Sequence, residues 1–185
     1  SSSDAATFRD WLIGKGMTIK TFKRVLASVR AIVNLTISEE GLGCSSAFAR
    51  TYLPAEINPA KREPIPLEGI KRIQTLCMTI DDDMRWLIAL ISETGMRLGE
   101  AAGLHLDDIR LNEPIPHIDL KPHPWRLLKT KGSERCIPLV GVALWAAERI
   151  VENGMERKLA FPRYCNEAAC NANSASNGLN KWLRQ

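Results

Sequence analysis

The sequence predicts a mainly α-helical protein with a small antiparallel β-sheet, an α+β fold. Four observations support this prediction. Apolar residues recur at helical spacing in several stretches of the chain, and short extended runs separated by Pro, Gly and Ser follow Asp108. A proline-rich stretch divides the chain into two parts. The hydrophobic fraction of 45% and the charged fraction of 25% are typical of a globular protein.

The first strong helical pattern covers residues 18–40. Thr21 is the candidate N-cap, and Gly41 and Gly43 end the pattern, as glycine commonly does just past a helix. One side of this helix is apolar. The other side carries four cations, Lys20, Lys23, Arg24 and Arg30. By spacing alone, the basic side is best interpreted as the solvated face of an amphipathic bundle helix.

Residues 54–66 are the best candidate for a linker between domains. Helical periodicity is poor there, and the stretch holds four prolines, Pro54, Pro59, Pro64 and Pro66. Each proline biases the preceding residue toward an extended conformation. We therefore expect a first domain at residues 1–53 and a second domain at residues 67–185.

The second part is expected to begin with helices and to continue with the sheet. Helical patterns occupy residues 67–79, 81–93, 96–104, 140–152 and 174–183. Extended runs occupy residues 115–120, 125–130, 135–139 and 159–161. Residues 131–134, Lys-Gly-Ser-Glu, are the predicted tight turn between the second and third of these runs.

Composition excludes several classes of protein. No stretch approaches the roughly 20 apolar residues that a membrane span needs, and the first residues lack the basic and apolar regions of a secretion signal. These first residues are typical of an internal start. The net charge of +4 is compatible with a polyanionic partner without establishing one.

The cysteines indicate a protein of the reducing cytoplasm. Five are present, an odd number at scattered positions with no C-x-x-C pair, so neither a disulfide framework nor a zinc site is expected. Cys165 and Cys170 are the pair weighed as metal ligands, and the three histidines form no ligand cluster with them. We expect no metal and no cofactor.

The segment at residues 93–104, ETGMRLGEAAGL, carries the residues best suited to chemistry. Arg97 and Glu100 are three residues apart, so a helix places them on one face. Glu100 can then hold the guanidinium of Arg97 as a rigid donor fork suited to two phosphate oxygens. By spacing alone, an ordinary surface ion pair is the favoured interpretation.

Two motifs together resemble the tyrosine recombinases, the family of the phage-type integrases. TGMRLGEAAGL at residues 94–104, with Asp-Asp-Ile at 107–109, resembles the first-arginine box of that family. LKTKGSERCIPL at residues 128–139 resembles its β-hairpin, whose turn carries a catalytic lysine. Residues 21–42 are similar to the last long helix of the family's core-binding domain, and residues 179–183 to the helix before its second-arginine box.

The resemblance implies a fold, an activity and a partner. The chain would hold the end of a helical core-binding domain, a linker and the first portion of a tyrosine recombinase catalytic domain. The reaction would be site-specific recombination or integration of double-stranded DNA through a phosphotyrosyl intermediate. The full-length protein would work as a tetramer on DNA, without a metal, a cofactor or a membrane.

Residue roles follow from the same match. Arg97 would neutralise the reacting phosphate and Glu100 would orient Arg97. Lys131 would be the catalytic lysine and general acid, with Lys129 as the weaker candidate. The residues expected to contact DNA are Lys20, Lys23, Arg24, Arg30, Lys129 and Arg135.

Part of the family pattern has no counterpart in these residues. The second-arginine box, H-x-L-R-H, and then the tyrosine nucleophile should follow residues 179–183, so we interpret the chain as an incomplete fragment that is inactive alone. Arg184 lies in KWLRQ, which lacks both histidines, and is not expected to supply the second arginine. Tyr52 and Tyr164 precede the place of the nucleophile, and neither is expected to be catalytic.

Three other functions are weighed against this one. A type IB topoisomerase would share the chemistry, but the hairpin and the linker fit an integrase better. A non-catalytic DNA-binding remnant of a prophage integrase would keep the fold without the reaction. A helical interaction module with no nucleic-acid role requires both motif matches to be accidental.

Overall fold

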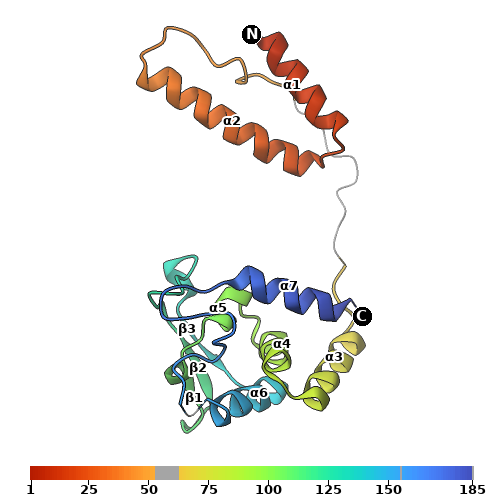
Figure 1. Ribbon diagram of the computed structural model, residues 1–185, viewed down its shortest axis with the longest axis vertical. Coiled ribbons are helices and arrows are strands. Elements are labelled where there is room, and N and C mark those ends of the chain that lie inside the picture. The colour runs from red at the N-terminus through yellow and green to blue at the C-terminus, as the bar shows by residue number, and fades with distance from the viewer. Residues whose placement is uncertain (53–62, 155, 185) are drawn as a thin grey trace. The chain divides into compact units, whose positions relative to one another are not determined.

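The computed structural model describes residues 1–52, 63–154 and 156–184, apart from the side chain of Lys131 (Figure 1). The chain forms two compact units, Ser1–Glu63 and Pro64–Gln185, and each has its own hydrophobic core. Most of the linker expected at residues 54–66 lies outside the described residues. None of the described helices is long and apolar enough to cross a membrane.

The first unit is built on a pair of helices, α1 (Ser2–Gly14) and α2 (Ile19–Glu39), that contact each other. Leu12 of α1 and Phe22 and Leu26 of α2 form its small buried core. Helix α1 is missing from the sequence-based prediction, because its buried stripe is too sparse to give a clear helical period.

Helix α2 confirms the helix expected at residues 18–40 but not its N-cap. Thr18 is the N-cap residue, and its Oγ1 accepts a hydrogen bond from the backbone N–H of Thr21 at 3.3 Å. An N-cap side chain accepts from an N–H two or three residues further on, which makes Thr21 the donor. Gly41 follows the helix with φ of 60°, a conformation that glycine adopts without strain.

Helix α4 lies at the centre of the second unit. The helices of this unit in the described residues are α3 (Leu67–Ile80), α4 (Asp83–Thr94), α5 (Leu98–Ala102), α6 (Gly141–Glu152) and α7 (Ala172–Leu183). Helix α4 contacts the other four, as Figure 1 shows. Four consecutive residues, Leu87 to Leu90, are buried, as expected of a helix that is surrounded by protein.

Helix α5 is shorter than the helix predicted at residues 96–104. Arg97 has an extended backbone, with φ of −66° and ψ of 146°, and serves as the N-cap residue. Gly103 is the C-cap. Arg97 therefore stands just before the first turn of α5 and not on a helix face.

A three-stranded antiparallel sheet completes the second unit. Its order is β1 (Ile109–Arg110), β2 (His117–Leu120) and β3 (Arg135–Pro138). Ile118 of β2 pairs with Ile109 on one side and Ile137 on the other, and all three side chains are buried in the core. Strands β2 and β3 confirm the extended runs expected at residues 115–120 and 135–139.

The strand predicted at residues 125–130 is wrong. These residues belong to the connection between β2 and β3, where two of their side chains bind the main chain around α5. Trp125 Nε1 donates to the carbonyl of Gly103 at 3.0 Å, and Arg126 Nη1 donates to the carbonyl of Glu100 at 2.9 Å. The predicted tight turn is a short 3-10 turn, η2 (Lys131–Ser133), at the end of this connection.

The strand predicted at residues 159–161 is also wrong, because only one bridge forms there. Leu159 pairs with His105, flanked by a hydrogen bond from the N–H of Ala160 to the carbonyl of Leu104 at 2.9 Å. The chain then turns inward, and Phe161 is fully buried.

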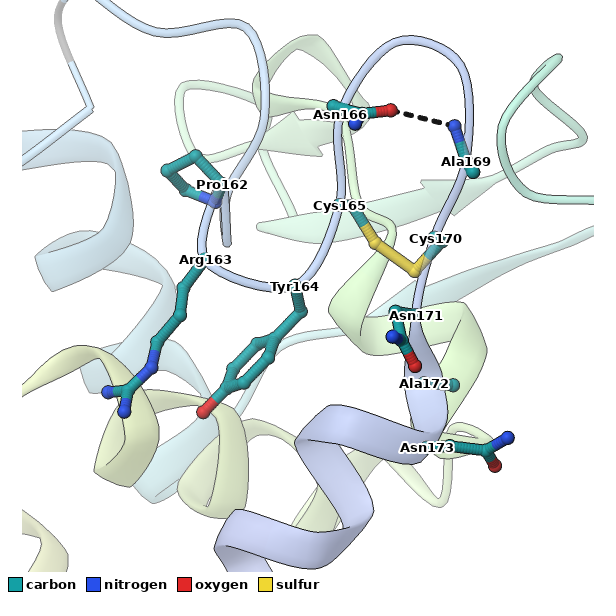
Figure 2. Close-up of a pocket in the computed structure, with 10 residues that line it drawn as sticks. All are labelled: Pro162, Arg163, Tyr164, Cys165, Asn166, Ala169, Cys170, Asn171, Ala172 and Asn173. Carbon is teal, nitrogen blue, oxygen red and sulfur yellow. Dashed lines mark hydrogen bonds between the residues drawn. A yellow bond between two sulfur atoms is a disulfide. The ribbon is translucent and has the colours of Figure 1, made fainter.

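Cys165 and Cys170 are joined by a disulfide, which corrects the expectation of unpaired cysteines (Figure 2). The N–H of Asn166 donates to the carbonyl of Ala169 at 2.9 Å, so the loop between the cysteines folds back on itself. This path brings the two Cα atoms within 4.1 Å, which the spacing in the sequence does not reveal. The loop borders a cavity of about 450 Å³, lined by Arg163, Tyr164 and Asn171 among others.

Candidate functional site

Arg97 and Glu100 form a close ion pair at the start of α5. The backbone N–H of Arg97 donates to Glu100 Oε2 at 3.0 Å, and Arg97 Nη1 donates to Glu100 Oε1 at 2.6 Å. The third residue of a helix commonly reaches back in this way to the N-cap N–H. The expected pairing of Arg97 with Glu100 is therefore present. It arises from helix capping, because Arg97 is the N-cap residue and does not share a helix face with Glu100.

The two partners differ sharply in exposure. The side chain of Glu100 is 4% exposed, whereas that of Arg97 is 55% exposed. Burial acts to raise the pKa of Glu100, but hydrogen bonds from the N–H and guanidinium of Arg97, and from Arg135, outweigh it and lower the pKa. Glu100 is thus a fixed anion at neutral pH. Arg97 is held on one side and open to solvent on the other.

Arg135, at the start of β3, is the second cation on Glu100. Its Nη2 donates to Glu100 Oε2 at 3.1 Å, and its Nη1 donates to the carbonyl of Ser133 at 2.8 Å. The sequence predicts Arg135 as a DNA contact. In the structure, both of its terminal nitrogens donate to groups within the protein.

The turn predicted to carry the catalytic lysine lies against Arg97. Ser133 is buried, and its Oγ lies 3.4 Å from Arg97 Nη1 and 2.9 Å from Thr130 Oγ1. The side chain of Lys131 lies outside the described residues. Lys129 is exposed and lines the same cavity of about 320 Å³ as Arg97 and Glu100.

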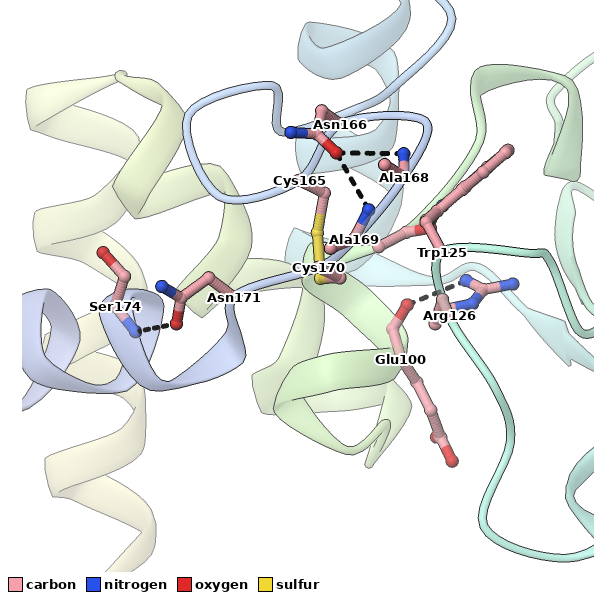
Figure 3. The surroundings of a disulfide bond; sticks show 11 residues. Glu100, Trp125, Arg126, Cys165, Asn166, Ala168, Ala169, Cys170, Asn171 and Ser174 are labelled. Carbon is pink, nitrogen blue, oxygen red and sulfur yellow. Dashed lines mark hydrogen bonds between the residues drawn. A yellow bond between two sulfur atoms is a disulfide. The ribbon is translucent and has the colours of Figure 1, made fainter.

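A buried ion pair beneath α5 supports the main chain of Glu100. Arg126 is 4% exposed, and besides the Glu100 carbonyl it donates to the carbonyl of Lys121 and to Asp108 Oδ2, the latter at 3.5 Å. Figure 3 shows the carbonyl of Glu100 turned toward Arg126 and its carboxylate pointing away. Burial lowers the pKa of Arg126 below its ordinary value.

Asp108 is the counter-ion of this buried arginine. It is fully buried, with His123 Nε2 at 2.7 Å from Oδ2 and Lys121 Nζ at 3.2 Å from Oδ1. The sequence pattern places Asp108 beside the segment that resembles the first-arginine box, but it indicates no role for Arg126 or His123. The acidic pair Asp107 and Asp108 before Ile109 is the one sequence feature that indicates this buried ion pair.

The cations expected on the first unit divide into two groups. Lys20, Lys23 and Arg24 have exposed side chains on α2. Arg30 is half-buried, and it donates through Nε to the carbonyl of Phe48 at 2.7 Å and through Nη2 to that of Thr51 at 3.4 Å. Arg30 therefore joins α2 to the segment that follows it.

The residues not expected to be catalytic occupy other places. Arg184 is exposed at the C-terminal end of α7, about 18 Å along a helix whose first residue, Ala172, packs near Gly99. Tyr164 is buried, its hydroxyl has no hydrogen-bond partner among the described residues, and burial raises its pKa. Tyr52 is exposed in the first unit.

Solved structures provide the informative comparison with known proteins. The chain matches the Tn1549 transposon integrase bound to circular-intermediate DNA with a TM-score of 0.71 and 16% identity, over 99% of this chain and 62% of that one. It matches a tyrosine-to-phenylalanine variant of that integrase, bound to transposon right-end DNA, with a TM-score of 0.61 and 18% identity, over 83% and 51%.

The shared fold extends through both units, although the chain spans less than two thirds of the length of either matched structure. No protein family and no curated protein matches the sequence.

Proposed function

Because the chain has the fold of the tyrosine recombinases, we propose that it belongs to a site-specific DNA recombinase that acts through a phosphotyrosyl intermediate. One observation carries this proposal. Arg97, in the segment that resembles the first-arginine box, and Ser133, in the turn that carries Lys131, are 36 residues apart in the sequence but lie in contact. Arg97 and Glu100 of the first motif and Lys129 of the second line one cavity, and such a convergence of cations supports a site for phosphate chemistry.

Arg97 is proposed to bind the reacting phosphate. Its guanidinium is oriented by a buried carboxylate and is more than half exposed, so it can donate to the non-bridging oxygens without reorganising. Among the described residues, its Nε and Nη2 have no hydrogen-bond partner. Such a cation stabilises the negative charge that builds up as a hydroxyl attacks phosphorus.

Lys131 is proposed as the general acid, with Lys129 as the alternative. When the tyrosine oxygen forms its bond to phosphorus, the bond to the 5′ oxygen breaks, and that oxygen takes the proton of the lysine. The bond energy stays in the protein–DNA link, so the strand can be resealed without a nucleotide cofactor. We assign the nucleophile to neither Tyr52 nor Tyr164.

Double-stranded DNA is the proposed partner, contacted by the exposed cations of α2, Lys20, Lys23 and Arg24, and by Lys129. We further propose that the recombinase acts as an oligomer on DNA in the cytoplasm, for a mobile element such as a phage. The matched integrase was solved on DNA, which supports the choice of partner.

The test maps phosphate contacts directly. Duplexes bound by the chain are selected from a random library, and phosphate ethylation interference is then measured for wild type and for Arg97→Ala. We expect a common sequence to be enriched, and Arg97→Ala to lose interference at one phosphate of that site. Arg110→Ala, an exposed arginine of β1, is the control and should keep the wild-type pattern.

Two outcomes would contradict the proposal. If no sequence is enriched, the chain does not recognise a DNA site. If Arg97→Ala keeps the complete wild-type pattern, Arg97 does not contact phosphate, and the chain is a DNA-binding protein without this chemistry.

A further inference from the structure

We propose that Arg135 is a positioning residue, which fixes the turn carrying Lys131 to Arg97 through the shared carboxylate of Glu100. This inference deepens the proposed function, on which it rests for the identity of the phosphate ligand. It replaces the expectation that Arg135 contacts DNA. The coupling itself can be observed in the free chain.

The two hydrogen bonds of Arg135 join two different segments. Nη1 binds the carbonyl of Ser133, the last residue of the turn, and Nη2 binds Glu100 Oε2, at 2.8 Å and 3.1 Å. A planar guanidinium fixes these two donors in one fork, so the position of the turn main chain and that of the carboxylate become one geometric unit.

Both ends of this link are anchored. Arg135 begins β3 and is paired in the sheet with Leu120 of β2. The carbonyl of Glu100 accepts a hydrogen bond from Arg126 Nη1, and Oε1 of Glu100 accepts one from Arg97 Nη1. The turn at residues 131–133 is thus held between a strand and a helix start.

The contact between Ser133 and Arg97 is weak on its own. The Oγ of Ser133 lies 3.4 Å from Arg97 Nη1, at the outer limit of a hydrogen bond, and it also interacts with Thr130 Oγ1. The bonds made by Arg135 are shorter, and one of them reaches the buried carboxylate. The distance between Arg97 and the lysine turn therefore depends mainly on Arg135.

The exposures of the two arginines fit different roles. The side chain of Arg97 is 55% exposed and that of Arg135 is 35% exposed. Both terminal nitrogens of Arg135 already donate to the protein, whereas among the described residues Arg97 Nη2 is without a partner. Arg97 is arranged to bind a ligand, and Arg135 is arranged to join the turn to the carboxylate that holds Arg97.

The first experiment uses the free chain of residues 1–185. Amide hydrogen exchange of the turn, including the N–H of Ser133 that donates to Thr130, is measured together with the NMR signal of the Arg97 Nε–H group. Arg135→Ala should speed exchange in the turn about tenfold, as expected for loss of its anchoring bonds, and should shift the Arg97 signal. Arg110→Ala should change neither.

A conservative variant separates geometry from charge. Arg135→Lys keeps the positive charge but cannot bridge the carbonyl and the carboxylate with one planar fork. A positioning role predicts that Arg135→Lys behaves like Arg135→Ala in both measurements. If lysine restores wild-type exchange and the wild-type Arg97 signal, charge alone is sufficient and the inference is wrong. The lysine variant also gives a result if the alanine variant fails to fold.

The second experiment uses the phosphate interference map. Arg135→Ala should weaken interference at the same phosphate as Arg97→Ala, and the double variant should lose no further phosphate. Loss of a different phosphate by Arg135→Ala would show that Arg135 contacts DNA directly and would overturn the positioning role.

Failure of the inference differs from failure of the proposed function. If Arg97→Ala leaves the interference map unchanged while Arg135→Ala still shifts the Arg97 signal, the phosphate role is wrong and the coupling stands. If Arg97→Ala removes its phosphate while Arg135→Ala alters neither exchange nor the Arg97 signal, the coupling is wrong and the phosphate role stands.

Discussion

Glu100 is the residue on which the site depends. It accepts hydrogen bonds from the backbone N–H and the guanidinium of Arg97 and from Arg135, with only 4% of its side chain exposed. A carboxylate buried to this extent is stable as an anion only when it is paired. Its ionisation therefore controls how Arg97 and Arg135 are held.

The lowered pKa of Glu100 links the stability of the second unit to pH. A group whose pKa is depressed by folding adds stability above its unfolded value and loses it as the pH falls through its folded value. The wild-type chain should therefore be more stable than Glu100→Gln at neutral pH, and the difference should shrink below the ordinary glutamate value of 4.5. Thermal unfolding of both chains at a series of pH values measures this. A difference that stays constant in acid would contradict it.

Asp108 and Arg126 should be far more costly to lose singly than together. Both are buried, and removal of one charge leaves the other uncompensated. Asp108→Leu should lower the free energy of unfolding by about 3–5 kcal/mol. The double variant Asp108→Leu, Arg126→Met should lose clearly less than the sum of the single losses, as measured by urea denaturation. Strictly additive losses would show that the two side chains act independently.

At the scale of elements, helical periodicity predicted the helices better than the extended runs predicted the strands. Helices α3, α4, α6 and α7 follow from their apolar spacing, because each buries one side or more in a common core. The run at residues 125–130 is extended in pattern, yet Trp125 and Arg126 bind the main chain around α5 and no strand forms there. The pattern in one sequence gives the spacing of the apolar residues, but it does not show against which helix or strand they pack.

The same limit explains which part of the site was predicted. Arg97 and Glu100 lie within one short motif, where spacing and family resemblance both apply. Arg126 and Glu100 are 26 residues apart, and His123 and Asp108 are 15 apart. No spacing rule connects such pairs, because only the path of the chain between β2 and β3 brings them together.

Gly103, the C-cap residue of α5, packs closely against Arg126 of the connection between β2 and β3. A Cβ there would lie 2.8 Å from Cδ of Arg126 and 3.0 Å from its Cβ and Cγ. Gly103→Ala should therefore displace Arg126 from the carbonyl of Glu100 and destabilise the unit by about 1–3 kcal/mol.

Gly99→Ala is the matched control for this substitution. Its added Cβ would meet Ala172 Cβ at an ordinary 3.6 Å, and it lies within helix α5. Alanine favours a helix interior over glycine by about 1 kcal/mol, so Gly99→Ala should be neutral or stabilising. Equal free energies of unfolding for the two variants would show that the contact at Gly103 is not a constraint.

At the scale of the whole molecule, each unit presents its own cations to solvent. Lys20, Lys23 and Arg24 are exposed on the first unit and Lys129 on the second, whereas Arg30 is bound to carbonyl groups within the first unit. The net charge of +4 is modest, so we expect a polyanion to bind where exposed cations such as these lie and not evenly over the surface.

The salt dependence of DNA affinity should distinguish the exposed cations of the first unit from Arg30. Each phosphate contact adds about 0.9 to the slope of log affinity against log salt concentration. The triple variant Lys20→Ala, Lys23→Ala, Arg24→Ala should reduce the slope by about 2–3, as measured by fluorescence anisotropy of a labelled duplex. Arg30→Ala should leave the slope unchanged and lower the melting temperature of the first unit. A slope loss for Arg30→Ala equal to that of a single exposed lysine would refute the structural role.

The carboxylate shared by Arg97 and Arg135 also bears on how proteins of this fold can diversify. Arg135 and Glu100 lie 35 residues apart, in two different segments of the chain. In a chimera that takes the segment of Arg135 from this chain but not the segment of Glu100, Arg135 would lack the carboxylate that it binds. In the reverse chimera, Glu100 would lack the hydrogen bond that Arg135 donates. We therefore expect the residues at positions 100 and 135 to change together among chains of this fold.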